Sequence, residues 1–315
     1  MSRSIVSLQQ GLIDYAGIFP PSKLPLKQAL HNYIRYQGEE ERWKLNSFIV
    51  SFDELVHLLK LLENIEQIPK IDLTVTLPKL EAEVFTSRVD NLEQVLQNVM
   101  QQLPKQVQIV GLEVAIPNTL KPTLHRVAQL STTLSVQLFC EISILAQSEE
   151  VIIANIEDIQ LFNKKRKQLA TLALKLRTGG VTEDLFPTPS ILAHAIAQSA
   201  KHRLMIKYTA GLHHPIRMYR DEVKTKMFGF VNVVAATLYA YEFKLTAHEI
   251  KKILIEEDAS AFQITDTSIQ WQSYCLQSEK IEQLRQAFKV CFGSCSFDEP
   301  KSEFKLLFEK GGVKV

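Results

Sequence analysis

Four charged residues stand near the ends of otherwise apolar runs in this sequence: Glu113, Glu141, Lys175 and Lys207. Side chains alternate between the two faces of a strand, so in residues 172–177 Lys175 lies opposite the leucines. A neutral lysine amine attacks carbonyl groups, and carboxylates can move the protons of that reaction. The alternative is a structural layer of ion pairs. Because burying such a layer is costly, the cluster favours a functional site.

Strand-like runs alternate with segments of helical period, which is typical of βα units and a parallel sheet. The runs are Leu12 to Phe19, Asn46 to Val50, Ile71 to Leu77, Val107 to Ile116, Ser135 to Ile142, Leu172 to Arg177, Leu204 to Thr209 and Lys289 to Phe297. Eight such strands predict an α/β fold, a (β/α)8 TIM barrel, with an open doubly wound sheet as the alternative. In a barrel the four charges point to the C-terminal mouth, where active sites lie.

Helix signals support this organisation. A capping box, Ser51-x-x-Glu54, precedes leucines of helical spacing at 55, 58, 59 and 62. We predict a single barrel domain over residues 1–315, with residues 210–288 packed on it as a helical insertion before the last strand. The insertion is expected to contain a helix over 226–243, a helix opened by the box Thr246-x-x-Glu249, a hairpin over 261–271 and a helix around Leu284.

Composition limits the partners. The 36 Lys and Arg against 35 Asp and Glu give a net charge of +1, which disfavours nucleic-acid binding through a broad basic face. The stretch Met227 to Tyr241 is too short and too polar to span a bilayer, so we expect no membrane contact. Four cysteines and no recognisable signal peptide favour a cytoplasmic location. The apolar stretch could serve either as core or as the interface of a homo-oligomer.

Two lysine-containing segments carry a resemblance to a known family. They are Lys175 to Gly180 (KLRTGG) and Lys207 to Gly211 (KYTAG), 32 residues apart on consecutive strands. They resemble the paired-lysine motifs of deoxyribose-phosphate aldolases, which are class I, Schiff-base aldolases on a TIM barrel. Three further segments agree in order: Leu12 to Asp14 with that family's first strand, Glu113 to Pro117 (EVAIP) with an Asp-containing motif, and Phe292 to Ser296 (FGSCS) with its phosphate loop.

The chain departs from the family pattern at three places. Leu212 stands where the aldolases have a second glycine, and Arg177 and Glu113 replace a small hydroxyl residue and an Asp. The segment before the last strand is also longer. The resemblance therefore implies a distant bacterial relative that acts on a different substrate.

The resemblance implies an aldolase-like lyase that cleaves a small carbonyl compound carrying an anionic group. Lys175 would form the Schiff base, and Lys207 would lower the pKa of Lys175 toward about 8 by charge repulsion. Glu113, with Glu141, would transfer protons. The anionic group would bind to residues of the loops at the mouth, of which Arg177 is the charged partner. The other expected contacts are Asp14, Thr178, Gly179, Gly180, Gly211, His213, Gly293 and Ser294.

A second hypothesis is a non-catalytic or degenerate barrel in which Lys175, Arg177 and Lys207 only clamp a phosphate or carboxylate. We expect no cofactor and no metal, since two lysines oppose a dication held by carboxylates of the site. His213 and His214 are adjacent, so in an extended loop they would point opposite ways and at most one would face the site.

Overall fold

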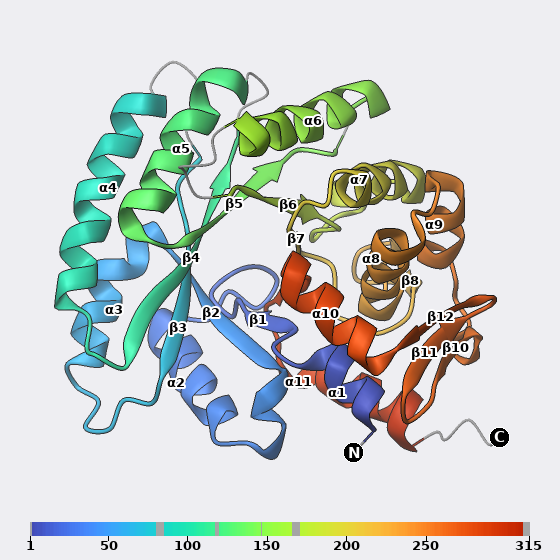
Figure 1. Cartoon of the computed structure of the whole chain (residues 1–315). Helices are drawn as coiled ribbons and strands as arrows, with labels where there is room; N and C mark the ends of the chain where they lie inside the picture. The colour runs from blue at the N-terminus through green and yellow to red at the C-terminus, as the bar shows by residue number, and fades with distance from the viewer. Residues whose placement is uncertain (1, 80–84, 117–119, 146, 166–170, 311–315) are drawn as a thin grey trace.

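A computed structural model describes residues 2–79, 85–116, 120–145, 147–165 and 171–310. Pro117, the last residue of one expected motif, lies outside these ranges. Eight parallel strands form the centre of the molecule (Figure 1). They are β1 (Ile13–Tyr15), β2 (Leu45–Ser51), β3 (Ile71–Thr76), β4 (Val107–Ala115), β5 (Gln137–Ile142), β6 (Ala173–Arg177), β7 (Ile206–Thr209) and β13 (Cys291–Ser294).

The sheet is closed. β1 pairs in parallel with both β2 and β13, and β13 pairs with β7, so the order β1-β13-β7-β6-β5-β4-β3-β2 returns to its start. The predicted (β/α)8 barrel is therefore confirmed, and the open sheet is excluded. Seven of the expected runs contain one of these strands each, and the run Asn46 to Val50 lies within β2, which extends one residue further at both ends.

Helices surround the barrel and pack apolar side chains against it (Figure 1). They are α2 (Leu26–Gln37), α3 (Leu55–Leu62), α4 (Phe85–Gln102), α5 (Leu120–Leu134), α6 (Glu149–Lys165), α7 (Pro189–Lys201) and α8 (Phe230–Phe243), with α11 (Asp298–Phe304) after the last strand. None of the described helices is long and apolar enough to cross a membrane.

The expected capping box at Ser51 is wrong. A 3-10 turn over Phe52–Glu54 follows β2 directly, α3 begins only at Leu55, and the Ser51 side chain caps neither element. The turn displaces the first helical amides from the serine, so its hydroxyl cannot reach them. In contrast, Thr246 and Glu249 form both hydrogen bonds of the second expected box.

Residues 210–288 contain helices and two small antiparallel sheets. The hairpin β8 (Met218–Arg220) and β9 (Thr225–Met227) occupies the expected start of the first helix, so α8 begins at Phe230. Then come α9 (Ala247–Leu254), the sheet β10 (Phe262–Ile264), β11 (Ser268–Trp271) and β12 (Tyr274–Gln277), and α10 (Ser278–Phe288), which packs beside α1 (Arg3–Gln9). The expected hairpin is thus present as β10 and β11, with β12 as a third strand.

α8 explains the most apolar stretch of the sequence. Every residue from Phe230 to Tyr241 is buried, because α7, α9 and α10 all pack on this helix. Its inner side contacts the barrel: Phe230 stacks on Phe292 of β13 with ring centroids 5.2 Å apart, and Thr237 shares a hydrogen bond with Tyr208 of β7. The stretch is a core helix.

Candidate active site

A buried chain of ion pairs crosses the inside of the barrel. Lys175 Nζ lies 2.7 Å from Glu141 Oε2 and 2.8 Å from Glu113 Oε2. The other oxygen of Glu113 lies 2.6 Å from Lys207 Nζ, which is also 2.7 Å from Asp14 Oδ2. The side chains of Glu113, Lys207 and Asp14 are at most 2 % exposed. Glu113 therefore bridges the two lysines.

Strand register places these groups together. On neighbouring strands Glu141 is the partner of Lys175, and Lys175 is the partner of Lys207. The residues on either side of Lys175, Leu174 and Leu176, are fully buried in the apolar layer between barrel and helices. This layer fixes which face of β6 turns outward and so directs Lys175 inward.

The carboxylates hold both lysines in the ammonium form. Burial alone would lower the pKa of Lys175, but Glu113 and Glu141 outweigh it and raise that pKa. The pKa of Lys207 is raised in the same way by Asp14 and Glu113. Burial opposes ionisation of Glu113, yet the two ammonium groups lower its pKa to about 2. The expectation that Lys207 lowers the pKa of Lys175 is therefore wrong, because a carboxylate lies between the two amines.

Asp14 is held in place by β2. Its Oδ1 accepts hydrogen bonds from Asn46 Nδ2 at 2.8 Å and from the backbone N–H of Ser47 at 2.9 Å, and the Ser47 hydroxyl donates a third. The same hydroxyl contacts Thr74 Oγ1 at 2.7 Å. Sequence reasoning missed these residues. Small polar residues on the inward face of apolar strands are the signal that could have found Ser47 and Thr74.

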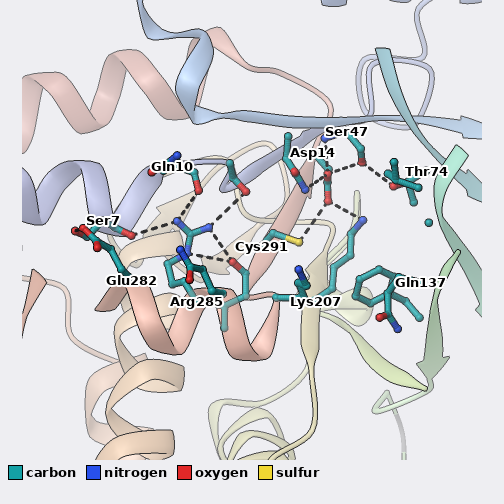
Figure 2. A pocket seen from close by; sticks show the side chains of 18 residues that line it. Ser7, Gln10, Asp14, Ser47, Thr74, Gln137, Lys207, Glu282, Arg285 and Cys291 are labelled. Atoms are coloured by element: carbon teal, nitrogen blue, oxygen red, sulfur yellow. Dashed lines mark hydrogen bonds and ion pairs between the residues drawn. The ribbon is translucent and has the colours of Figure 1, made fainter. Parts of the chain in front are cut away.

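Lys207 and Asp14 border a cavity of about 380 Å³ at the N-terminal end of the barrel (Figure 2). Its walls include Gly11, Gln137 and Val290, which lie at or before the starts of their strands. In Figure 2 the Lys207 side chain points toward Asp14, with Cys291 beside them. Neither Lys207 nor Asp14 borders the cavity at the other end of the barrel.

A cavity of about 330 Å³ occupies the C-terminal mouth. Lys175, Glu113 and Glu141 border it, and its apolar wall includes Phe19 and Leu185. Further expected site residues around it are Arg177, Gly180, Gly211, His213 and Gly293. Of the two lysines, only Lys175 can therefore meet a molecule bound at the mouth.

The glycines of the mouth allow close packing between loops. A Cβ atom at Gly179 would lie 2.5 Å from the Phe186 ring, and one at Gly180 would lie 2.5 Å from Leu185 Cβ. Gly211 has a φ of +75°, and a Cβ there would lie 2.8 Å from the Gly179 Cα atom. Loop contacts alone thus account for glycine at these three positions.

Hydrogen bonds fix the remaining expected residues. The Thr178 hydroxyl donates to the carbonyl of Ala210 at 2.5 Å, which ties the loops after β6 and β7 together. The Ser294 carbonyl accepts from the Ala16 N–H, and its hydroxyl accepts from the Ser296 N–H. Arg177 is 37 % exposed, and its Nε lies 3.8 Å from Glu141 Oε1. Arg177 borders the mouth cavity.

The two adjacent histidines turn toward the same helix. His213 Nδ1 lies 3.1 Å from Glu299, and His214 Nδ1 lies 2.8 Å from Glu303, both on α11. The expectation that the two rings point opposite ways is wrong, because the chain bends at His214 instead of staying extended. His213 borders the mouth cavity.

Comparisons with known proteins do not assign this chain to a family. A scan against models of protein families finds no match to this chain, and a search of curated proteins finds none.

Proposed function

We propose that this protein is a lyase of the class I aldolase type, which cleaves a small carbonyl compound bearing an anionic group through a Schiff base on Lys175. The observation that carries the proposal is the position of Lys175. Its amine borders the mouth cavity between two carboxylates, whereas Lys207 lies behind Glu113 and borders the opposite cavity.

The reaction begins with loss of a proton from Lys175, since only the neutral amine attacks a carbonyl carbon. Transfer of this proton to a neighbouring carboxylate is unfavourable, because the ordinary pKa values of a lysine and a glutamate differ by roughly six units. At neutral pH the neutral amine therefore forms mainly when the proton is released to solvent. Glu141 lies 2.7 Å from the amine and is 24 % exposed, so it can relay the proton from Lys175 to solvent. Glu113 is shared between two ammonium groups and fully buried, which makes it the poorer acceptor.

The neutral amine then forms a C–N bond, and the carbonyl oxygen takes up a proton to give a carbinolamine. Protonation of this hydroxyl expels water and leaves an iminium ion on Lys175. The bond between the α and β carbons breaks, its electron pair moves toward the iminium to give an enamine, and a carboxylate beside Lys175 takes the β-hydroxyl proton as an aldehyde or ketone forms. The enamine carbon then takes up a proton, and water adds to the resulting iminium ion. This breaks the C–N bond, releases the second carbonyl product and restores the amine. The carboxylates beside Lys175 stabilise the positive iminium without reorganisation.

The anionic group of the substrate is assigned to Arg177. Its guanidinium is partly exposed at the mouth, where Nη1 donates to the Gly179 carbonyl at 3.2 Å and Nε lies 3.8 Å from Glu141. An arginine has five N–H donors, so others remain for a carboxylate or phosphate. A cavity of about 330 Å³ restricts the substrate to a small molecule. The four cysteines are free thiols, which agrees with the proposed cytoplasmic location.

The second candidate is a non-catalytic barrel that binds an anion. The observation that favours it is the raised pKa of Lys175, which leaves little neutral amine at pH 7. A binder would raise the melting temperature with its ligand and would gain no mass after borohydride reduction. The proposed lyase would be modified covalently.

Replacement of Arg177 tests the substrate class. With borohydride trapping of small aldehydes and ketones, we expect compounds bearing a carboxylate or phosphate to react at lower concentration than neutral ones. Arg177→Ala should raise the concentration needed for the anionic compounds about 10- to 100-fold, because a charge-assisted hydrogen bond of about 1.5–3 kcal/mol is lost. Neutral compounds should react as before. Intact-mass analysis measures the adduct.

Arg3→Ala is the matched control, since Arg3 is 54 % exposed and pairs with Glu279 and Glu282 of α10, away from the mouth. If neutral and anionic compounds react at the same concentrations, and Arg177→Ala leaves those concentrations unchanged, the substrate need not carry an anionic group and that part of the proposal is wrong.

A further inference from the structure

The segment after β7 and the helix after β13 meet beside the mouth in a cluster outside the ion-pair chain. His214 is 4 % exposed, and its Nδ1 lies 2.8 Å from each oxygen of Glu303. Glu299, one helical turn earlier on α11, supplies a second carboxylate. One ligand atom from each of these three residues lies within 4.8 Å of the other two.

These separations suit a single metal ion. Cations of the zinc type bind imidazole nitrogen and carboxylate oxygen at about 2.0–2.2 Å, which places neighbouring ligand atoms roughly 3–3.5 Å apart. An imidazole together with two carboxylates favours divalent transition metals over Mg²⁺ and Ca²⁺, which prefer oxygen alone.

Arg220 supplies the positive charge at this place, and its Nη2 lies 3.5 Å from Glu303 Oε1. Its contact with His214, however, is mismatched. Its Nη2 lies 2.7 Å from His214 Nδ1, the same nitrogen that faces both oxygens of Glu303. If Nδ1 carries a proton, it opposes the guanidinium N–H; if it is bare, its lone pair opposes two carboxylate oxygens. Arg220 Nε is also buried, and it has no hydrogen-bond partner among the residues that the structure describes. Neither tautomer of His214 satisfies the cluster.

We propose that His214, Glu299 and Glu303 bind one divalent transition-metal ion, with Zn²⁺ and Mn²⁺ as its representatives, and that Arg220 withdraws when the ion enters. Withdrawal is feasible because β8 is an exposed edge, where Tyr219 is 53 % exposed. The ion would join the loop after β7 to α11. His213 precedes the proposed ligand His214 in the chain and borders the mouth cavity. The ion would therefore fix one side of that cavity.

The test uses the full-length protein after treatment with a chelator. Titration with ZnCl₂ and MnCl₂ is followed by calorimetry and by thermal unfolding, with MgCl₂ as the comparison. We expect saturable one-to-one binding of Zn²⁺ or Mn²⁺ with a rise in melting temperature, and no rise with MgCl₂ at equal concentration. Glu299→Gln should weaken binding at least tenfold and should fold, because Glu299 is 42 % exposed. Arg220→Met should tighten it, since it removes the competing cation.

Glu149→Gln is the matched control. Glu149 faces His194 at 3.0 Å in a similar His–Glu pair outside the cluster, so its loss should leave the affinity unchanged. The proposal is overturned if neither Zn²⁺ nor Mn²⁺ binds one-to-one, or if Glu299→Gln binds as tightly as Glu149→Gln.

Discussion

Replacing Glu113 by glutamine is expected to lower the free energy of unfolding at pH 7 by about 3–5 kcal/mol, because it leaves two buried ammonium groups without their shared carboxylate. The lowered pKa of Glu113 corresponds to a loss of stability of similar size. A fall from 4.5 to about 2 corresponds to roughly 3 kcal/mol at 1.36 kcal/mol per pKa unit. Urea unfolding of both proteins measures the difference.

The sign of the pH dependence follows from the lowered pKa. Glu113 stabilises the fold when it is ionised, so its contribution is present above pH 4.5 and is lost as the pH falls toward 2. The difference between Glu113→Gln and the unaltered protein should therefore shrink over that interval. Glu279→Gln is the control, since its exposed pair with Arg3 should be worth about 1 kcal/mol or less. An effect of Glu113→Gln as small as that of the control would refute the ion-pair chain.

The rate of adduct formation at Lys175 is expected to rise about tenfold per pH unit from pH 7 to 10, or about a thousandfold in all. Its pKa is raised above the ordinary 10.5, so over this range the neutral fraction grows in proportion to hydroxide concentration. Samples incubated with a small aldehyde at each pH and reduced with borohydride give the rates by intact mass.

Glu141→Gln provides the internal comparison. It removes one of the two carboxylates that raise the pKa of Lys175, so the profile should move to lower pH. Circular dichroism at pH 10 must show that the fold persists. A rate that levels off near pH 8 in the unaltered protein would mean that the carboxylates do not hold the amine as an ammonium ion.

Strand alternation was the strongest predictor available in the sequence. The leucines around Lys175 fix the outward face of β6. The same reasoning correctly predicted that the side chains of Glu113, Glu141 and Lys207 point into the barrel. The eight strands could be predicted because each is a short apolar run between helical segments. Closure could not be distinguished from an open sheet, since it depends on the pairing of β1 with β13, which are far apart in sequence.

Alternation gives the side of a strand but not the height of a residue inside a tilted barrel. Sequence reasoning therefore did not reveal that Glu113 separates the two amines, or that Lys207 and Asp14 border the cavity at the opposite end. It also could not tell a glycine that binds a ligand from one required by packing, as at Gly211, because both leave the same residue in the sequence.

The most direct test of the central claim is to locate the lysine that forms a reducible adduct. The protein is incubated with a panel of small aldehydes and ketones, reduced with borohydride, digested and mapped by mass spectrometry. We predict one modification, on Lys175, which is lost in Lys175→Arg and retained in Lys207→Arg once both variants are shown to fold. A protein modified nowhere, or modified equally in Lys175→Arg, would contradict the Schiff-base mechanism and favour the anion-binding barrel.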